Sequence, residues 1–117
     1  MKKPPYISHY LVSRDLLQGI DVRQYSDTIR YLCSRIENIK LDLTKEGIKF
    51  IEDVTRESSY ARYKPYILVP TAENLNRAKR LLESYATDEV LSFLESKPYI
   101  ANGNDSRINY DESGDSL

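Results

Sequence analysis

The chain has one cysteine, one histidine, four glycines and no tryptophan, and each scarcity excludes a class of protein. Cys33 alone cannot form an intramolecular disulfide, and one cysteine with one histidine cannot build a structural zinc site. The few glycines form neither a P-loop nor a dinucleotide-binding fingerprint. No apolar run reaches about 18 residues, and no apolar signal region follows the N-terminal lysines, so we expect a cytoplasmic protein without membrane contact.

Residues suited to catalysis are isolated from one another. His9 has no cysteine or carboxylate motif around it, and the chain lacks the G-x-S-x-G motif of a nucleophile elbow. Cys33 lies on an apolar stripe, where a small core residue is expected rather than a nucleophile. Glu52 and Asp53 are neighbours in a predicted strand and would point to opposite faces. We therefore expect no enzyme, no metal site and no cofactor.

Charge is distributed unevenly along the chain. Residues 1–82 carry 15 Lys and Arg against 10 Asp and Glu, a net charge of +5, whereas residues 83–117 carry 2 against 8, a net charge of −6. A basic body with an acidic tail suits nucleic-acid binding, because binding depends on where charge lies. A short acidic tail can equally serve solubility alone. The ten tyrosines suit half-buried positions or a binding surface.

Apolar periodicity predicts helices in four places. Ile29, Leu32, Cys33 and Ile36 give the clearest stripe, and Ser26 is a suitable N-cap before them. Gly19 and Gly47 mark turns. The predicted helices span residues 7–17, 26–39, 72–85 and 88–96, with Thr71 and Thr87 as caps of the last two.

The segment between the second and third helices predicts a β-hairpin. Residues 48–54 and 60–69 have strand-like patterns, and the polar residues 56–59 form a turn between them. Helices followed by a hairpin are the order of a winged helix-turn-helix, in which the last helix before the hairpin enters the major groove and the hairpin forms the wing.

One stretch carries a family resemblance. "DTIRYLCSRIENIKLDLTKEGIKFIEDVTRESSYARYKPYIL" runs from an apolar helix through a Gly-Ile pair and a strand into a polar turn and the "ARY" of residues 61–63. The sequence from Ser13 to Leu68 resembles the small winged helix-turn-helix proteins of bacteriophages and prophages. The resemblance implies an α+β fold and a sequence-specific transcriptional regulator of phage or mobile-element origin that binds double-stranded DNA.

This interpretation divides the chain into three parts. Residues 1–70 would form the winged helix-turn-helix domain, residues 71–97 a C-terminal helical extension, and residues 98–117 a disordered acidic tail with few apolar residues. Because helix-turn-helix proteins commonly read paired half-sites, the extension would supply a homodimer interface. Its predicted residues are Leu82, Tyr85, Val90, Phe93 and Leu94.

The predicted DNA contacts lie on the outward face of the 26–39 helix and along the hairpin. Arginine can bind guanine bidentately, asparagine can bind adenine, and serine, tyrosine and lysine can reach phosphates. The set is Arg30, Tyr31, Ser34, Arg35, Asn38, Arg56, Tyr60, Arg62 and Lys64. A solvated helix face beside a charged edge strand would show similar residues. Two other functions stay open: an inhibitor or adaptor that binds a host protein, and an RNA-binding protein whose tyrosines stack on unpaired bases.

Overall fold

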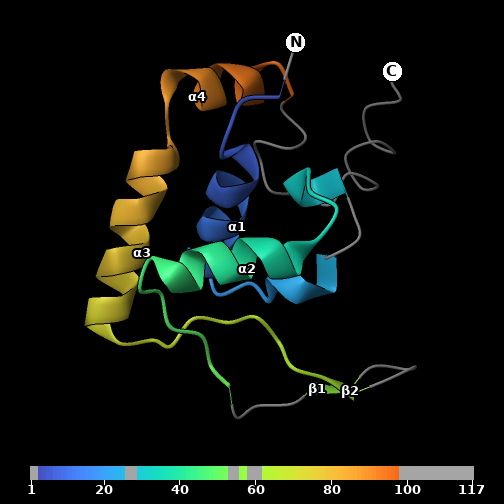
Figure 1. Cartoon of the computed structure of the whole chain (residues 1–117), viewed down its shortest axis with the longest axis vertical. Coiled ribbons are helices and arrows are strands. Elements are labelled where there is room, and N and C mark those ends of the chain that lie inside the picture. Colours follow the sequence, from blue (N-terminus) through green and yellow to red (C-terminus); the bar gives the residue numbers. More distant parts are fainter. Residues whose placement is uncertain (1–2, 26–28, 53–55, 58–61, 98–117) are drawn as a thin grey trace.

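The computed structural model describes residues 3–25, 29–52, 56–57 and 62–97, and this part of the chain is mainly helical (Figure 1). Its elements are α1 (Ile7–Leu17), the 3-10 turns η1 (Val22–Tyr25) and η2 (Ile29–Tyr31), α2 (Ile36–Lys45), β1 (Arg56–Glu57), β2 (Arg62–Tyr63), α3 (Ala72–Tyr85) and α4 (Asp88–Glu95). α3 packs alongside α1, and α1 also contacts α2 and η2. One buried apolar cluster joins residues from α1, α2, α3 and α4, so the C-terminal helices share the core of the N-terminal ones.

Glycines end the first two α-helices as the sequence predicts. Gly19 follows α1 with φ 80°, and Ile20 N–H donates to the Asp15 carbonyl at 3.1 Å. Gly47 follows α2 with φ 94°, and Ile48 N–H donates to the Leu43 carbonyl at 3.1 Å. Both ends have the left-handed residue and the back-bonded carbonyls of a Schellman motif, which only glycine enters without strain.

The predicted helix over residues 26–39 is wrong. η2 ends at Tyr31, Leu32 has φ 55°, and α2 begins only at Ile36. A positive φ at a leucine interrupts a helix, because the left-handed conformation brings its Cβ too close to the following carbonyl oxygen. The apolar spacing from Ile29 to Ile36 therefore joins a 3-10 turn to the start of a different helix, and residues 26–28 lie outside the described part.

The prediction of an α+β winged helix-turn-helix with a two-stranded wing is also wrong. The described part holds four α-helices, and its two strands are only two residues long, with Arg56 opposite Tyr63 and Glu57 opposite Arg62. Nearer the helices the two chain segments meet in an isolated bridge between Phe50 and Leu68. Residues 29–35 are not α-helical and α2 covers Ile36–Lys45 instead, so the predicted major-groove helix over residues 26–39 does not form as a single helix face.

The two C-terminal helices are confirmed, with the caps that the sequence indicates. Thr71 Oγ1 accepts from Asn74 N–H at 3.2 Å at the start of α3, and Thr87 Oγ1 accepts from Val90 N–H at 3.2 Å at the start of α4. Each cap satisfies one of the backbone donors that a helix leaves open at its first turn. The predicted tail at residues 98–117 lies outside the described residues.

Candidate functional site

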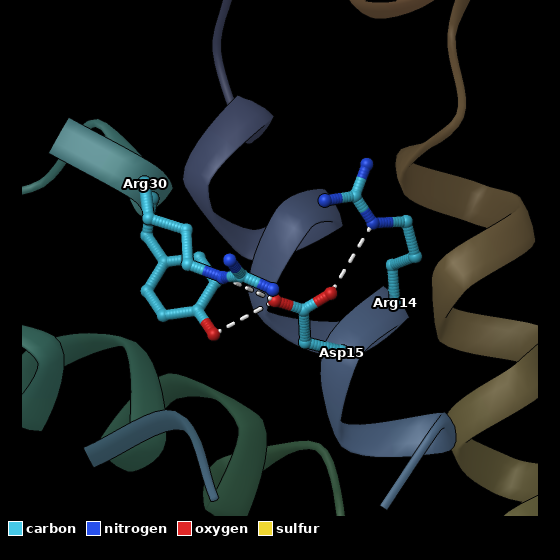
Figure 2. Close-up of polar contacts among 4 residues, drawn as sticks. Arg14, Asp15 and Arg30 are labelled. Atoms are coloured by element: carbon cyan, nitrogen blue, oxygen red, sulfur yellow. Dashed lines mark hydrogen bonds and ion pairs between the residues drawn. The ribbon is translucent and has the colours of Figure 1, made fainter. Parts of the chain in front are cut away.

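Two predicted DNA-contacting side chains, Arg30 and Tyr31, turn inward and bind Asp15 of α1 (Figure 2). Arg30 Nε donates to Asp15 Oδ2 at 2.9 Å, and the Tyr31 hydroxyl donates to the same oxygen at 2.8 Å. Arg14 Nε lies 3.4 Å from Oδ1, the other oxygen of that carboxylate. Tyr31 and Asp15 are completely buried, so Tyr31 cannot contact a DNA groove in this fold.

The pKa shifts in this buried network keep Arg30 charged and Tyr31 neutral. Burial raises the pKa of Tyr31 far above its ordinary value, and the charge of Asp15 adds to the rise. Burial alone would lower the pKa of Arg30, but the hydrogen bond and charge of Asp15 outweigh it, and the pKa is raised. Tyr31 therefore remains a neutral donor and Arg30 a cation, as a buried carboxylate requires. We assign the network to the fold, where it ties η2 to α1.

Three further predicted contacts are exposed but do not share one helix. Ser34 and Arg35 precede α2, whereas Asn38 lies in its first turn. The Arg35 side chain is 69% exposed, and its Nε lies 3.8 Å from a carboxylate oxygen of Glu37. Within residues 29–52 these side chains form no row along a single helix face, which is the arrangement that major-groove reading uses.

The predicted wing contacts are placed only in part. Arg56 lies in β1 and Arg62 in β2, where its cross-strand partner is the acidic Glu57. Tyr60 lies outside the described residues. Lys64 is exposed, and its carbonyl accepts a hydrogen bond from Arg23 at 3.4 Å. In Figure 1, β1 and β2 lie at the end of a segment that extends away from the helices. We call this segment between α2 and α3 the arm.

Other cations of the basic part are also held within the fold. The Arg23 guanidinium lies 5.2 Å from the centroid of the Tyr66 ring, and Lys40 Nζ lies 4.8 Å from the same centroid. Arg77 Nη1 donates to the Gly47 carbonyl at 3.0 Å. Arg23, Lys40 and Arg77 are therefore engaged with rings and carbonyls of the protein itself, whereas Lys45, Lys49, Lys64, Lys79 and Arg80 are exposed.

The predicted dimerisation residues are mostly core residues. Val90, Phe93 and Leu94 of α4 are buried in the apolar cluster, while Leu82 and Tyr85 of α3 are partly buried. The apolar face of α4 is thus covered by the rest of the same chain. This burial removes Val90, Phe93 and Leu94 from any surface that a second copy could contact, which corrects the sequence-based interpretation.

Two buried polar side chains that the sequence analysis missed hold the base of the arm. Asn74 of α3 accepts from Lys49 N–H at 2.8 Å and donates to the carbonyls of Lys49 and Val69 at 2.8 and 2.9 Å. Asp21 accepts from Tyr66 N–H at 2.9 Å. The available signal for Asn74 was its position, since it shares the buried face of α3 with Ala78 four residues later.

A second missed feature is a cluster of aromatic and acidic side chains from α1, α2 and α3 and the residues that cap them. The ring centroids of Tyr6, His9 and Tyr85 lie between 5.3 and 5.6 Å from one another. His9 Nε2 lies 2.9 Å from Asp42 Oδ2. Burial raises the pKa of Tyr85, and the charges of Glu46 and Asp42 add to the rise. We call these five residues the aromatic–acidic surface.

The aromatic–acidic surface is partly accessible, and its exposed tyrosine, Tyr6, has a strained backbone. The Tyr6 residue is 59% exposed and the Asp42 side chain 51% exposed. Tyr6 has φ 65°, a conformation that is unusual for a bulky residue and costs about 1 kcal/mol. Tyr6 nevertheless stacks on Tyr85 with an angle of 15° between the ring planes. Strain at an exposed aromatic residue is a reason to ask what the ring binds.

Comparisons of the chain with protein-family models, with curated proteins and with solved structures found no match. Among the described residues, no three His, Cys, Asp or Glu side chains are grouped closely enough to hold a metal ion. None of the described helices has the length and apolarity needed to cross a membrane. A functional assignment therefore has to come from the chemistry of the surface itself.

Proposed function

We propose that this protein is a small binding module that acts by occupying a surface of a partner protein. The observation that carries the proposal is that several arginines contact the fold while carboxylates of the aromatic–acidic surface are exposed. Arg30, Arg23 and Arg77 contact other groups of the fold, whereas the aromatic–acidic surface leaves rings and carboxylates open to solvent. Aromatic side chains are enriched at protein interfaces, since they bury a large area while keeping a polar end.

The exposed charge of the C-terminal helices indicates the sign of the partner. α4 exposes Asp88, Glu89 and Glu95, and the sequence that follows it adds Asp105, Asp111, Glu112 and Asp115 against Lys97 and Arg107. A negatively charged surface accelerates association with a positively charged partner and repels nucleic acid. We therefore propose a partner with a basic surface, and binding that weakens as salt screens the charges.

The test is affinity capture from a lysate treated with nuclease. We expect the full chain to retain one partner protein in a stoichiometric amount, to keep it after nuclease treatment, and to lose it as the salt concentration rises. Purified partner and chain should then form a complex of defined mass. Loss of every retained protein after nuclease digestion would contradict the proposal and point to a bound nucleic acid instead.

Nucleic-acid binding through the arm is the second candidate, and one observation favours it. Arg56, Arg62 and Lys64 lie on the arm, which extends away from the helical body (Figure 1). Cations on a projecting arm can follow a phosphate backbone, and binding would then fall steeply with salt. A mobility shift of duplex DNA or single-stranded RNA at low salt that is lost with Arg62→Ala would favour this candidate over a protein partner.

A further inference from the structure

The interior of this protein shows how it holds an arginine. The guanidinium of Arg30 lies 4.3 Å from the centroid of the Tyr25 ring, and its Nε donates to the Asp15 carboxylate at 2.9 Å. A tyrosine face and a carboxylate together bind a guanidinium well. The ring attracts the charge, and the carboxylate accepts its N–H donors in a fixed geometry.

The aromatic–acidic surface presents the same two groups without the cation. Tyr6 and Tyr85 supply the rings, and carboxylates come from Asp42 of α2 and from Glu46, the C-cap residue of that helix four positions later. Among the described residues, the cation–π contacts involve other rings, and no lysine or arginine side chain forms an ion pair with Asp42 or Glu46. His9 is the sole described basic group that contacts Asp42.

We infer that Tyr6, Tyr85, Asp42 and Glu46 form a recognition site for an arginine side chain of the partner protein. The inference rests on the proposed function and names the group that the partner would insert. The guanidinium stacks on the exposed Tyr6 ring and donates to the carboxylates of α2. Arginine fits better than lysine, because its planar group stacks on a ring and bonds a carboxylate with two donors at once.

The left-handed backbone of Tyr6 agrees with this role. The residue precedes the first turn of α1, where its carbonyl accepts from Tyr10 N–H at 2.9 Å, and its ring is stacked on Tyr85. Glycine would suit φ 65° better for folding alone. A tyrosine there holds an aromatic ring against Tyr85 while more than half of the residue stays exposed.

The experiment titrates the protein with a capped Gly-Gly-Arg-Gly-Gly peptide and follows the tyrosine ring signals by NMR. Two further peptides carry lysine or the uncharged citrulline in place of arginine. We expect saturable shifts of the Tyr6 and Tyr85 ring signals with the arginine peptide, weaker binding of the lysine peptide, and no binding of the citrulline peptide. Equal shifts with citrulline, or binding of lysine as tight as that of arginine, would overturn the inference.

Variants locate the site. Tyr6→Ala should weaken arginine-peptide binding by about fivefold, and Asp42→Asn and Glu46→Gln by about threefold each. Glu73→Gln is the matched control, because it removes an exposed carboxylate at the opposite end of α3, about 18 Å along the helix from Tyr85. Circular dichroism should show that all four variants remain folded. Unchanged affinity in folded Tyr6→Ala would overturn the site.

The outcomes separate this inference from the proposed function. A protein partner that binds Tyr6→Ala as tightly as the unmodified chain would refute the arginine site and leave the binding module intact. Peptide binding at Tyr6 with no protein retained from the nuclease-treated lysate would refute the proposed function and leave the arginine-binding chemistry of the surface standing.

Discussion

The buried network around Asp15 and the aromatic–acidic surface are built from the same kinds of side chain. They differ in how far the carboxylate is enclosed by partners within the protein. In the interior, Arg30 and Tyr31 both donate to one buried carboxylate, and a tyrosine ring covers the arginine. At the surface, the ion-pair partner of Asp42 among the described residues is His9, and half of the Asp42 side chain is exposed to solvent. A carboxylate that is buried among its hydrogen-bond donors stabilises the fold, whereas a carboxylate that is half exposed is available to a partner.

The comparison also explains why residue type alone misassigns function. Arg30 and Tyr31 have the chemistry of DNA contacts, yet the fold buries both against Asp15. Burial of a charged group is costly unless its partners are fully in place, so a closed network is evidence of a structural role. An aromatic ring and a carboxylate that remain partly exposed keep their capacity to bind something else.

The largest predicted effect comes from removing the buried carboxylate. Asp15→Asn removes the buried negative charge that Arg30 contacts, and breaking a buried pair costs about 3–5 kcal/mol. Urea denaturation should show this loss in the free energy of unfolding. Asp42→Asn is the matched control, which should change stability by less than about 1 kcal/mol, because exposed ion pairs contribute little. Similar losses in the two variants would remove the distinction between the two regions.

The helices that sequence could predict are those whose signals are local. Thr71 and Thr87 cap α3 and α4, and Gly19 ends α1, each within one turn of the element that it bounds. The segment 26–39 could not be predicted in this way. Tyr31 reaches Asp15 across 16 positions of the sequence, and the turn at Leu32 makes that contact feasible. A tertiary contact of this kind leaves no periodic trace.

The next largest effect comes from Asn74, whose buried and uncharged side chain holds the base of the arm. Asn74→Ala removes three hydrogen bonds to the backbone of Lys49 and Val69 and leaves their polar groups unsatisfied. We expect a loss of about 2–3 kcal/mol in the free energy of unfolding. Asn76→Ala, on the exposed face two residues later, should be neutral or slightly stabilising, because alanine favours helix. An equal loss in both variants would contradict a specific role for Asn74.

A smaller effect depends on pH and belongs to Tyr31. Because its pKa is raised in the folded state, the folded protein keeps a proton that the unfolded chain releases above about pH 10. Stability is therefore fully present below that pH and falls as the pH rises. Tyr31→Phe should lose about 1 kcal/mol at pH 7, because one hydrogen bond is removed, and its stability should then fall less steeply in alkaline solution. Denaturation by urea at pH 8, 10 and 11 measures both slopes.

Tyr66 and Tyr85 also contribute to the loss of stability in alkaline solution. Burial raises the pKa of each, so part of the alkaline slope should remain in Tyr31→Phe. Parallel pH dependences of the unmodified chain and the variant would show that burial and the charge of Asp15 do not raise the pKa of Tyr31 in the folded protein.

The site at the aromatic–acidic surface could not be read from sequence for the same reason as the Asp15 network. His9 and Asp42 are 33 positions apart, and Tyr6 meets Tyr85 across most of the described chain. In the sequence His9 is a lone histidine, and Tyr85 is a predicted dimerisation residue. Neither pattern indicates that the two rings lie 5.4 Å apart.

The smallest predicted effect separates the backbone of Tyr6 from its ring. Tyr6→Ala and Tyr6→Gly both remove the ring, so both should lose arginine-peptide binding to the same extent. Their stabilities should differ, because only glycine enters a left-handed conformation without strain, and Tyr6→Gly should be more stable than Tyr6→Ala by about 1 kcal/mol. Thermal and urea unfolding of the pair measure this difference. Equal stability would mean that the strain at Tyr6 is absent in solution. The backbone conformation would then no longer support a binding role for this residue. The peptide titration would still test whether the ring binds arginine.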